Sequence, residues 1–185
     1  MFTGIVQAVG RIVRLSPFEI DSGSLDLSGM GTGDSVCVQG VCLTVTALTK
    51  HGFTADVSAE TLAVTSGLDK PGEVNLEKAV RMGESIGGHL VTGHVDGVGA
   101  VVRREGSIYA IRLPESLARY VARKGSICMD GVSLTVNRVE GEVFEVNLIP
   151  HTLGVTTLSR LAPGSKVNLE IDLIARYVER MLAER

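Results

Sequence analysis

The chain contains 185 residues, 44% of them apolar and 21% charged, and its formal net charge is −3. This composition excludes a disordered chain, and the acidic balance argues against a nucleic-acid partner, because nucleic-acid-binding proteins are normally basic. The N-terminal sequence lacks a basic and then apolar leader, and no apolar run reaches the ~18–20 residues of a membrane span. We therefore expect no signal peptide, no membrane partner and a cytoplasmic location.

Short β-branched runs follow one another along the chain, separated by glycine, aspartate and serine. In the first half these runs predict strands at 10–15, 34–39, 41–48 and 53–58. In the second half they predict strands at 99–104, 109–114, 126–130, 132–139 and 144–149. Many short strands at near-regular spacing indicate an all-β protein, built as a small sandwich or a closed barrel.

Helical patterns are fewer. Residues 114–125 carry apolar side chains at helical spacing with Pro114 in the first turn, and residues 25–33 form a weaker counterpart. Residues 173–185 predict a C-terminal helix with an apolar stripe formed by Ile174, Tyr177, Val178, Met181 and Leu182. This helix either packs on its own barrel or associates with copies from other subunits. The stripe runs to the end of the chain at the 3–4 spacing of a bundle seam, which favours association.

The chain is a twofold repeat with an offset of about ninety residues. Four blocks recur in the same order: 2–13 with 91–102, 39–45 with 130–136, 60–65 with 151–156, and 71–77 with 163–170. A period of this length predicts two duplicated domains, with a linker around 80–86. We expect an N-terminal barrel over 1–85, a C-terminal barrel over 86–172 and the helix over 173–185.

Positions that differ within matching blocks are candidates for unequal roles of the two halves. The pairs are Cys42 with Ser133, Gln39 with Asp130, Glu60 with His151, Asp56 with Asn147, and Ile5 with His94. Two homologous pockets with unequal polar groups would suit two bound molecules that play unequal parts. Sequence drift explains the same differences, so both interpretations stand at this stage.

The three cysteines form no disulfide framework, and their odd count fits a reducing compartment. Cys37 and Cys128 occupy equivalent places and are expected to be structural, whereas Cys42 is either an inert buried thiol or a contributor to a site. His89 and His94 are five residues apart, which would place them on opposite faces of a regular strand. No carboxylate or cysteine lies beside them at ligand spacing, so no metal site is expected.

The motifs MFTGIV, GVCLTV, GGHLVTGHVDG, DGVSLTVN, NLIPHTL and VNLEID occur in an order that resembles the riboflavin synthase family over nearly the whole chain. The resemblance implies two six-stranded Greek-key barrels and a C-terminal helix that joins three chains into a homotrimer. It implies 6,7-dimethyl-8-ribityllumazine as substrate and no cofactor or metal. Each barrel would bind one molecule, and a neighbouring subunit would complete each site. Association with lumazine synthase is left open.

The resemblance also implies the substrate-binding residues. For the first site they are Gly4, Ile5, Val6, Cys42, Leu43, Thr44, Asp56, Ala59, Glu60 and Thr61. For the second site they are Gly93, His94, Val95, Lys124, Ser133, Leu134, Thr135, Asn147, Ile149, Pro150, His151 and Thr152. Backbone groups would pair with the uracil-like ring edge, and polar side chains would hold the ribityl hydroxyls.

The implied reaction transfers a four-carbon unit between two lumazines, giving riboflavin and 5-amino-6-(D-ribitylamino)uracil. One C7 methyl group must lose a proton, a nucleophile must add at C7 of one partner, and the rings must stack. The resemblance marks the candidate catalytic residues Cys42, His94, Ser133, Ser35 and Asp172. His94 and Ser133 are the favoured groups for proton handling or positioning.

Three rival functions fit the same pattern. A non-catalytic lumazine- or flavin-binding protein would share the duplicated barrel, but such proteins lose polar motifs of the second half that are intact here. A flavin-dependent reductase would need a nicotinamide-binding unit, and the chain has no GxGxxG motif within a βαβ pattern. A purely structural trimerisation module would not need polar pockets in both halves.

Overall fold

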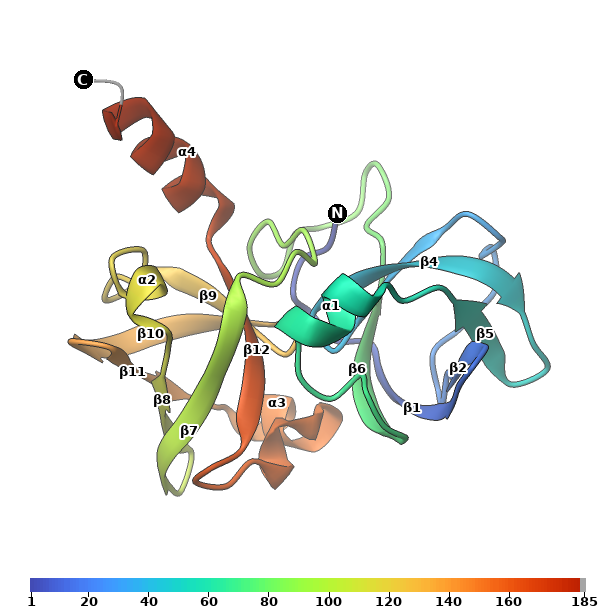
Figure 1. Ribbon diagram of the computed structural model, residues 1–185, viewed down its shortest axis with the longest axis horizontal. Coiled ribbons are helices and arrows are strands. Elements are labelled where there is room, and N and C mark those ends of the chain that lie inside the picture. Colours follow the sequence, from blue (N-terminus) through green and yellow to red (C-terminus); the bar gives the residue numbers. More distant parts are fainter. Residues whose placement is uncertain (184–185) are drawn as a thin grey trace.

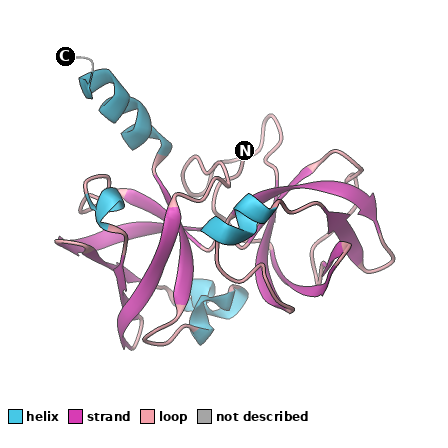
Figure 2. Cartoon of the chain, viewed as in Figure 1, coloured by secondary structure: helices cyan, strands magenta, loops and turns pink. Residues whose placement is uncertain are grey.

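The computed structural model describes residues 1–183, and the last two residues of the expected helix lie outside the described part. Strands dominate, and they form two barrels side by side (Figures 1 and 2). The strands of the first barrel are β1 (Ala8–Leu15), β2 (Phe18–Asp21), β3 (Ser35–Val38), β4 (Val41–Leu48), β5 (Gly52–Ala55) and β6 (Gly72–Lys78). Those of the second are β7 (Gly97–Glu105), β8 (Ile108–Arg112), β9 (Ser126–Met129), β10 (Val132–Glu140), β11 (Val143–Asn147) and β12 (Lys166–Ile171).

Both barrels close in the same order. The first runs β1-β2-β5-β4-β3-β6, and the second repeats this order with equivalent strands. All pairings are antiparallel, and the order confirms the expected six-stranded Greek-key barrel twice over. Register shifts occur at equivalent places, between Ile12 and Arg14 in β1 and between Val101 and Arg103 in β7. Such bulges bend a strand, which a small barrel needs in order to close.

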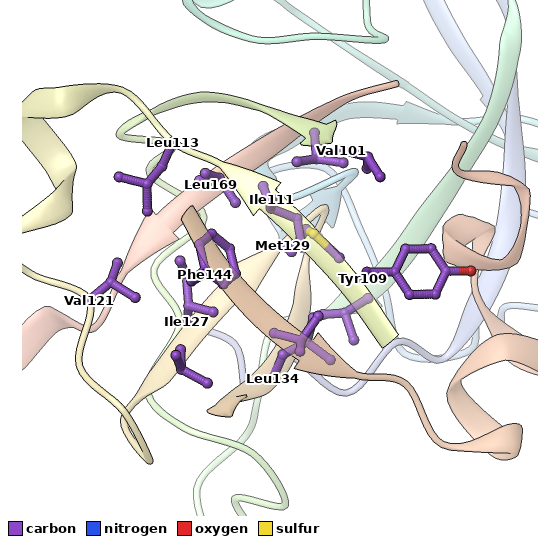
Figure 3. Packing of buried hydrophobic residues seen from close by; sticks show 14 of the residues in the cluster. Val101, Tyr109, Ile111, Leu113, Val121, Ile127, Met129, Leu134, Phe144 and Leu169 are labelled. Carbon is purple, nitrogen blue, oxygen red and sulfur yellow. The ribbon is translucent and has the colours of Figure 1, made fainter. Parts of the chain in front are cut away.

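Each barrel has its own apolar core. In the first, Ile12, Ile20, Phe53 and Leu76 are fully buried. In the second, side chains from all strands converge inside the barrel, among them Ile111, Met129 and Phe144 (Figure 3). The alternation of buried and exposed residues along β4 and β10 places one face of each strand in this core. The alternation of apolar and polar residues in the sequence therefore reflects the burial of one face of each strand in a core.

The two barrels are joined by reciprocal hydrogen bonds. The side-chain amide of Asn75 in β6 donates to the carbonyl of Asp130 at 2.8 Å, and Asn168 in β12 donates to the carbonyl of Gln39 at 2.9 Å. Gly40 and Gly131 stand back to back, since a Cβ atom on either would lie about 3 Å from the other's backbone nitrogen. The interface therefore uses the same turn from each half.

The nine expected strands are present, and three strands escaped prediction. β2 follows Pro17 and contains two acids, while β6 and β12 place Asn and Glu side chains in buried positions. Buried polar residues hide a strand from a pattern based on hydrophobicity. The buried glutamates of β6 and β12 organise the candidate sites.

The expected helix over 114–125 is wrong in length. Only α2 (Glu115–Ala118) is helical, and the expected counterpart over 25–33 consists of turns. Leu117 and Val121 are buried, as the pattern required, but the chain turns after Ala118 and leaves through Lys124 with a φ of 68°. Short helices missed by the pattern are α1 (Ala59–Val64), α3 (Pro150–Val155) and the 3-10 helix η1 (Thr157–Arg160).

The C-terminal helix α4 (Leu173–Ala183) extends from the second barrel away from the body of the protein (Figure 1). The five apolar stripe residues are between 48% and 71% exposed in the single chain. The described part of the helix contacts the barrel through Ala175, through ion pairs of Arg176 and Glu179, and through a hydrogen bond from the Tyr120 hydroxyl to Glu179. Within residues 1–183, no helix is long and apolar enough to cross a membrane.

Candidate functional site

The first residues of each half cross over to the opposite barrel. Phe2 and Val91 pair as an isolated antiparallel bridge between these two segments. The Gly4 carbonyl then accepts a hydrogen bond from the Ser133 N–H of the second barrel at 2.8 Å. The Gly93 carbonyl accepts from the Cys42 N–H of the first barrel, also at 2.8 Å.

This crossing corrects the grouping expected from sequence. Val6 packs against the core of the second barrel, and Val95 packs against the core of the first. Residues 4–6 therefore lie with Ser133, and residues 93–95 lie with Cys42. Repeat alignment could not reveal the exchange, because it matches each segment to its own half and says nothing of which barrel it touches.

Gly4 and Gly93 make the close approach possible. Their φ angles are 74° and 78°, in the left-handed region that favours glycine. A Cβ atom at Gly4 would lie 2.6 Å from Ser133, and one at Gly93 would lie 2.7 Å from Cys42. Any larger residue would push the crossing segment off the strand that carries the polar side chain.

A buried glutamate clamps each crossing segment. Glu77 of β6 accepts from the Thr3 N–H at 2.7 Å, from the Thr3 hydroxyl at 2.8 Å and from the Gly4 N–H at 3.0 Å. Burial raises the pKa of the Glu77 carboxyl, and the bonds from Thr3 and Gly4 oppose that rise. These bonds pin the backbone next to Ser133 to the first barrel.

Glu170 of β12 does the same for the second segment. It accepts from the Thr92 N–H and hydroxyl at 2.7 Å, from the Gly93 N–H at 2.8 Å and from the His94 N–H at 3.1 Å. Both glutamates are only 3% exposed. A buried carboxylate that accepts from several donors is a fixed anchor, because its loss would leave those N–H groups buried without an acceptor.

Most other expected residues belong to the barrel of Cys42 or to that of Ser133, and we call these two sets the two surfaces, although Leu43 and Leu134 themselves are buried in the barrel cores. In the barrel of Cys42, the sequence-predicted residues are Leu43 and Thr44 on β4, Asp56 after β5, and Ala59, Glu60 and Thr61 at α1. Of these, Asp56 lines a groove together with Phe18, Val57 and Leu62. Around Ser133, they are Leu134 and Thr135 on β10, Asn147 at the end of β11, and Ile149, Pro150, His151 and Thr152 at α3.

The polar groups of the two surfaces are unequal. The Ser133 hydroxyl lies 2.7 Å from Nδ1 of His89, a residue that the sequence analysis left out of both sites. Gly88 also covers Ser133, since a Cβ atom there would lie 2.8 Å from Oγ. Among residues 1–183, no histidine is hydrogen-bonded to Cys42 in this way. The repeat offers no signal for His89, because the matching block of the second half begins at residue 91.

His89 is held in a state suited to proton exchange. Its N–H donates to the Thr3 carbonyl at 3.1 Å, and the segment 86–90 is a loop. Burial lowers the pKa of the His89 imidazole, against the opposing charges of Asp172 and Glu170. This lowering of the pKa favours the neutral ring, and its buried Nε2 makes no protein hydrogen bond among the described residues.

The remaining candidates have other surroundings. Ser35 pairs with Thr44 across β3 and β4, and Asp172 accepts from the Ile174 N–H at 3.0 Å at the start of α4. Lys124 is exposed and replaces Gly33 at a left-handed position. Burial raises the pKa of the Cys37 and Cys128 thiols well above the ordinary value, in agreement with the expected structural role of both.

Both halves of the chain match one protein family. Residues 3–79 and 92–172 each match the family described as lumazine binding domain. The chain is 45% identical to the riboflavin synthase of Photobacterium phosphoreum, over 98% of this chain and 89% of that protein. It is 46% identical to that of Mycobacterium bovis, over 98% of each.

Solved structures are similar as well. The structure of LumP complexed with 6,7-dimethyl-8-(1'-D-ribityl) lumazine has a TM-score of 0.79 at 25% identity. The LumP complex with riboflavin has a TM-score of 0.81 at 27% identity. Each comparison covers 92% of this chain and 99% of the other.

Proposed function

This chain belongs to the riboflavin synthase family, and we propose that its two barrel surfaces are the two substrate sites of that enzyme's reaction. The reaction is a dismutation. Two 6,7-dimethyl-8-ribityllumazine molecules exchange a four-carbon unit and leave as riboflavin and 5-amino-6-(D-ribitylamino)uracil. The observation that carries the assignment is the matched pair of clamped segments, Thr3–Val6 and Thr92–Val95, each set against a strand of the opposite barrel.

The first site comprises Cys42, Leu43, Thr44 and the Asp56–Thr61 segment, completed by His94 and Val95. The second comprises Ser133, Leu134, Thr135 and the Asn147–Thr152 segment, completed by Ile5 and Val6, with Lys124 at its edge. These sets keep the strand, helix and loop residues expected from sequence and exchange the crossing residues Ile5, Val6, His94 and Val95, whereas Gly4 and Gly93 hold the crossing segments against the strands. The support is the contact of Val95 with the first core and of Val6 with the second.

The second site supplies the better-equipped proton-handling pair. With Nδ1 of His89 unprotonated, the Ser133 hydroxyl donates to it across 2.7 Å. Addition of the Ser133 oxygen at C7 of one lumazine would form the C–O bond while the hydroxyl proton passes to His89. The same imidazolium would return that proton as the C–O bond breaks, so that no oxidant, metal or cofactor enters. In this proposal, Cys42 contributes to binding in the first site.

Two open sites on one chain need a second chain to bring the bound rings together. We propose a homotrimer in which α4 associates through its exposed stripe and the first barrel of one subunit faces the second barrel of the next. Face-to-face positioning then supplies much of the acceleration, because effective molarities of well-oriented partners reach about 10⁵ M or more. The expected units stay 1–85, 86–172 and 173–185, in a cytoplasmic enzyme for which association with lumazine synthase is a separate proposal.

The alternative function is a lumazine- or flavin-binding protein without turnover. The likeness to LumP favours it as the second candidate, because LumP was solved with both lumazine and riboflavin. The intact Ser133–His89 pair argues for catalysis, since ligand binding alone needs no such pair.

The test is incubation of the purified protein with 6,7-dimethyl-8-ribityllumazine alone, with riboflavin followed by absorbance and fluorescence. Formation of one riboflavin per two lumazines consumed is the expected result. Tight binding of lumazine with no riboflavin above a protein-free control would overturn the enzyme assignment and support the binding protein.

A further inference from the structure

Each crossing segment ends at a residue whose side chain accepts a hydrogen bond from the backbone of its barrel, and this residue differs between the halves. Gln7 of the first half occupies the repeat position of Asp96 in the second. The side-chain oxygen of Gln7 accepts from the Lys78 N–H at 2.9 Å, and the Asp96 carboxylate accepts from the Ile171 N–H at 2.8 Å. The same bond is therefore made by a neutral amide in one half and by a carboxylate in the other.

The carboxylate is poorly solvated. The Asp96 side chain is only 10% exposed, and the buried Glu170 adds a like charge nearby. Burial raises the pKa of Asp96, while the bond from Ile171 and the charge of Arg176 lower it. A negative charge in such a place needs a cation, which the equivalent Gln7 does not.

The cation comes from outside the repeat. Arg176 lies on α4, which has no counterpart in the first half, and its guanidinium pairs with both Asp96 carboxylate oxygens at 2.8 Å. The same Nη2 donates to the His94 carbonyl at 3.3 Å. One side chain of the helix thus contacts the crossing segment at two points, on either side of Val95.

That segment ends in the opposite barrel. Its Gly93 carbonyl accepts from the Cys42 N–H, and Val95 packs against the first core. Glu170 fixes the beginning of the segment, through Thr92, Gly93 and His94. Arg176 fixes its end, so that the chain between the two anchors has little freedom to move away from Cys42.

We propose that Arg176 is a positioning residue that holds the His94–Asp96 segment in the first substrate site from helix α4. The inference rests on the proposed function of that site. It makes the first site depend on the placement of the helix whose apolar stripe is proposed to join subunits. Assembly and site geometry are then linked through one guanidinium group.

A merely structural ion pair would anchor the helix without affecting the site. The helix offers a matched control for this possibility, because Arg119 of the α2 turn pairs with Glu179 of α4 at 3.2 Å and contacts no residue of the crossing segment. Arg119→Gln therefore removes another contact between helix and barrel. It leaves the Arg176 contacts in place.

The experiment compares the full-length wild type with Arg176→Gln, Asp96→Gln, the double variant and Arg119→Gln. Riboflavin formation gives kcat/KM, amide hydrogen exchange reports on residues 93–95, and sedimentation gives the oligomeric state. We expect Arg176→Gln to lower kcat/KM about tenfold by loosening a site segment, with faster exchange at 93–95. Arg119→Gln should stay within about twofold of the wild type in both readouts.

The double variant is the decisive one. Asp96→Gln reproduces the amide of Gln7, which needs no cation, so adding it to Arg176→Gln should restore only the part of the activity that is lost to the unpaired Asp96 charge. The part that stays lost, together with the faster exchange at 93–95, measures the positioning by Arg176. A double variant equal to the wild type in both readouts, or equal effects of Arg176→Gln and Arg119→Gln, would overturn the proposal. A wild type that forms no riboflavin would overturn the proposed function instead, and the exchange data would still decide the role of Arg176.

Discussion

The surroundings of Cys42 and Ser133 show how one repeat unit is turned into two different sites. Both residues are the second residue of equivalent strands, and both donate a backbone N–H to the glycine carbonyl of a crossing segment at 2.8 Å. Ser133 is also covered by Gly88 and His89, which precede the second crossing segment, and Nδ1 of His89 lies 2.7 Å from its hydroxyl. The difference teaches that the repeated blocks supplied two similar strands, whereas a residue just ahead of one block supplied a polar partner to one of them.

The largest effect is expected from removing the clamps that make the halves alike. Glu77→Gln and Glu170→Gln each place an amide NH₂ group against N–H donors, which should lower the free energy of unfolding by about 3 kcal/mol. Because the segments cross, Glu77→Gln should impair the Ser133 site and Glu170→Gln the Cys42 site. Chemical denaturation measures the stability, and lumazine titration measures the sites.

Thr3→Val and Thr92→Val are matched controls for the clamps. Each removes one hydroxyl bond to the glutamate and keeps the backbone bonds to it, and Thr3→Val also loses a long bond from the Ile5 N–H at 3.3 Å, so the loss should be about 1 kcal/mol. Unfolding free energies of the glutamine variants within about 0.5 kcal/mol of the wild type would show that the buried carboxylates are not anchors.

The next largest effect concerns turnover, and it should distinguish the role of Ser133 from that of Cys42. His89→Ala removes the partner of Ser133, and we expect turnover to fall about 100-fold, the usual contribution of a positioned acid–base group. Cys42→Ala should lower turnover by less than about tenfold, because no base among residues 1–183 is hydrogen-bonded to that thiol. Single-turnover riboflavin formation at saturating lumazine measures both. Equal losses in the two variants would contradict the unequal roles assigned to the sites.

A smaller effect concerns Gln39 and Asp130, which face each other across the barrel interface. Burial raises the pKa of Asp130 from 3.8 to about 7. The folded protein therefore binds a proton that the unfolded chain has released between about pH 4 and pH 7. The contribution of the Asp130 carboxyl to the free energy of unfolding is fully present below about pH 4 and is lost as the pH rises to about 7.

Asp130→Asn should abolish this part of the pH dependence and exceed the wild type in stability by about 2 kcal/mol at pH 8. Denaturant titrations at pH 5 and pH 8 measure the difference. The reciprocal Gln39→Glu variant should gain a pH dependence of the same sign. Parallel curves for the wild type and Asp130→Asn across this range would contradict the prediction.

The smallest effect is expected at Lys124, whose φ of 68° is strained for a residue with a side chain. Its counterpart Gly33 has a φ of 96° and makes the equivalent bond, from its N–H to the Val45 carbonyl at 2.8 Å. Lys124→Gly should stabilise the fold by up to about 1 kcal/mol and weaken lumazine binding if the lysine serves the second site. Gly33→Ala, the control, should destabilise by about 1 kcal/mol. A Lys124→Gly variant with unchanged stability and binding would leave the lysine without a role in either.

The amino-acid sequence by itself determined the fold class, the duplication and most of the strands. Period-2 patterns in β4 and β10 survive because each strand has one face in a core, and the repeat in motifs such as LTV reports directly on equivalent burial. The residues expected at the two surfaces came from the family resemblance, and they remain a prediction.

Only the tertiary structure decided which segment completes which surface. Hydrogen bonds such as those from Ser133 to Gly4 and from Cys42 to Gly93 join residues about fifty to 130 positions apart. Local pattern carries no information on such contacts, because the energy that selects them comes from burial and pairing in the assembled barrels. The partnership of His89 with Ser133 belongs to the same class. So does that of Arg176 with Asp96, in which a residue outside the repeat balances a charge inside it.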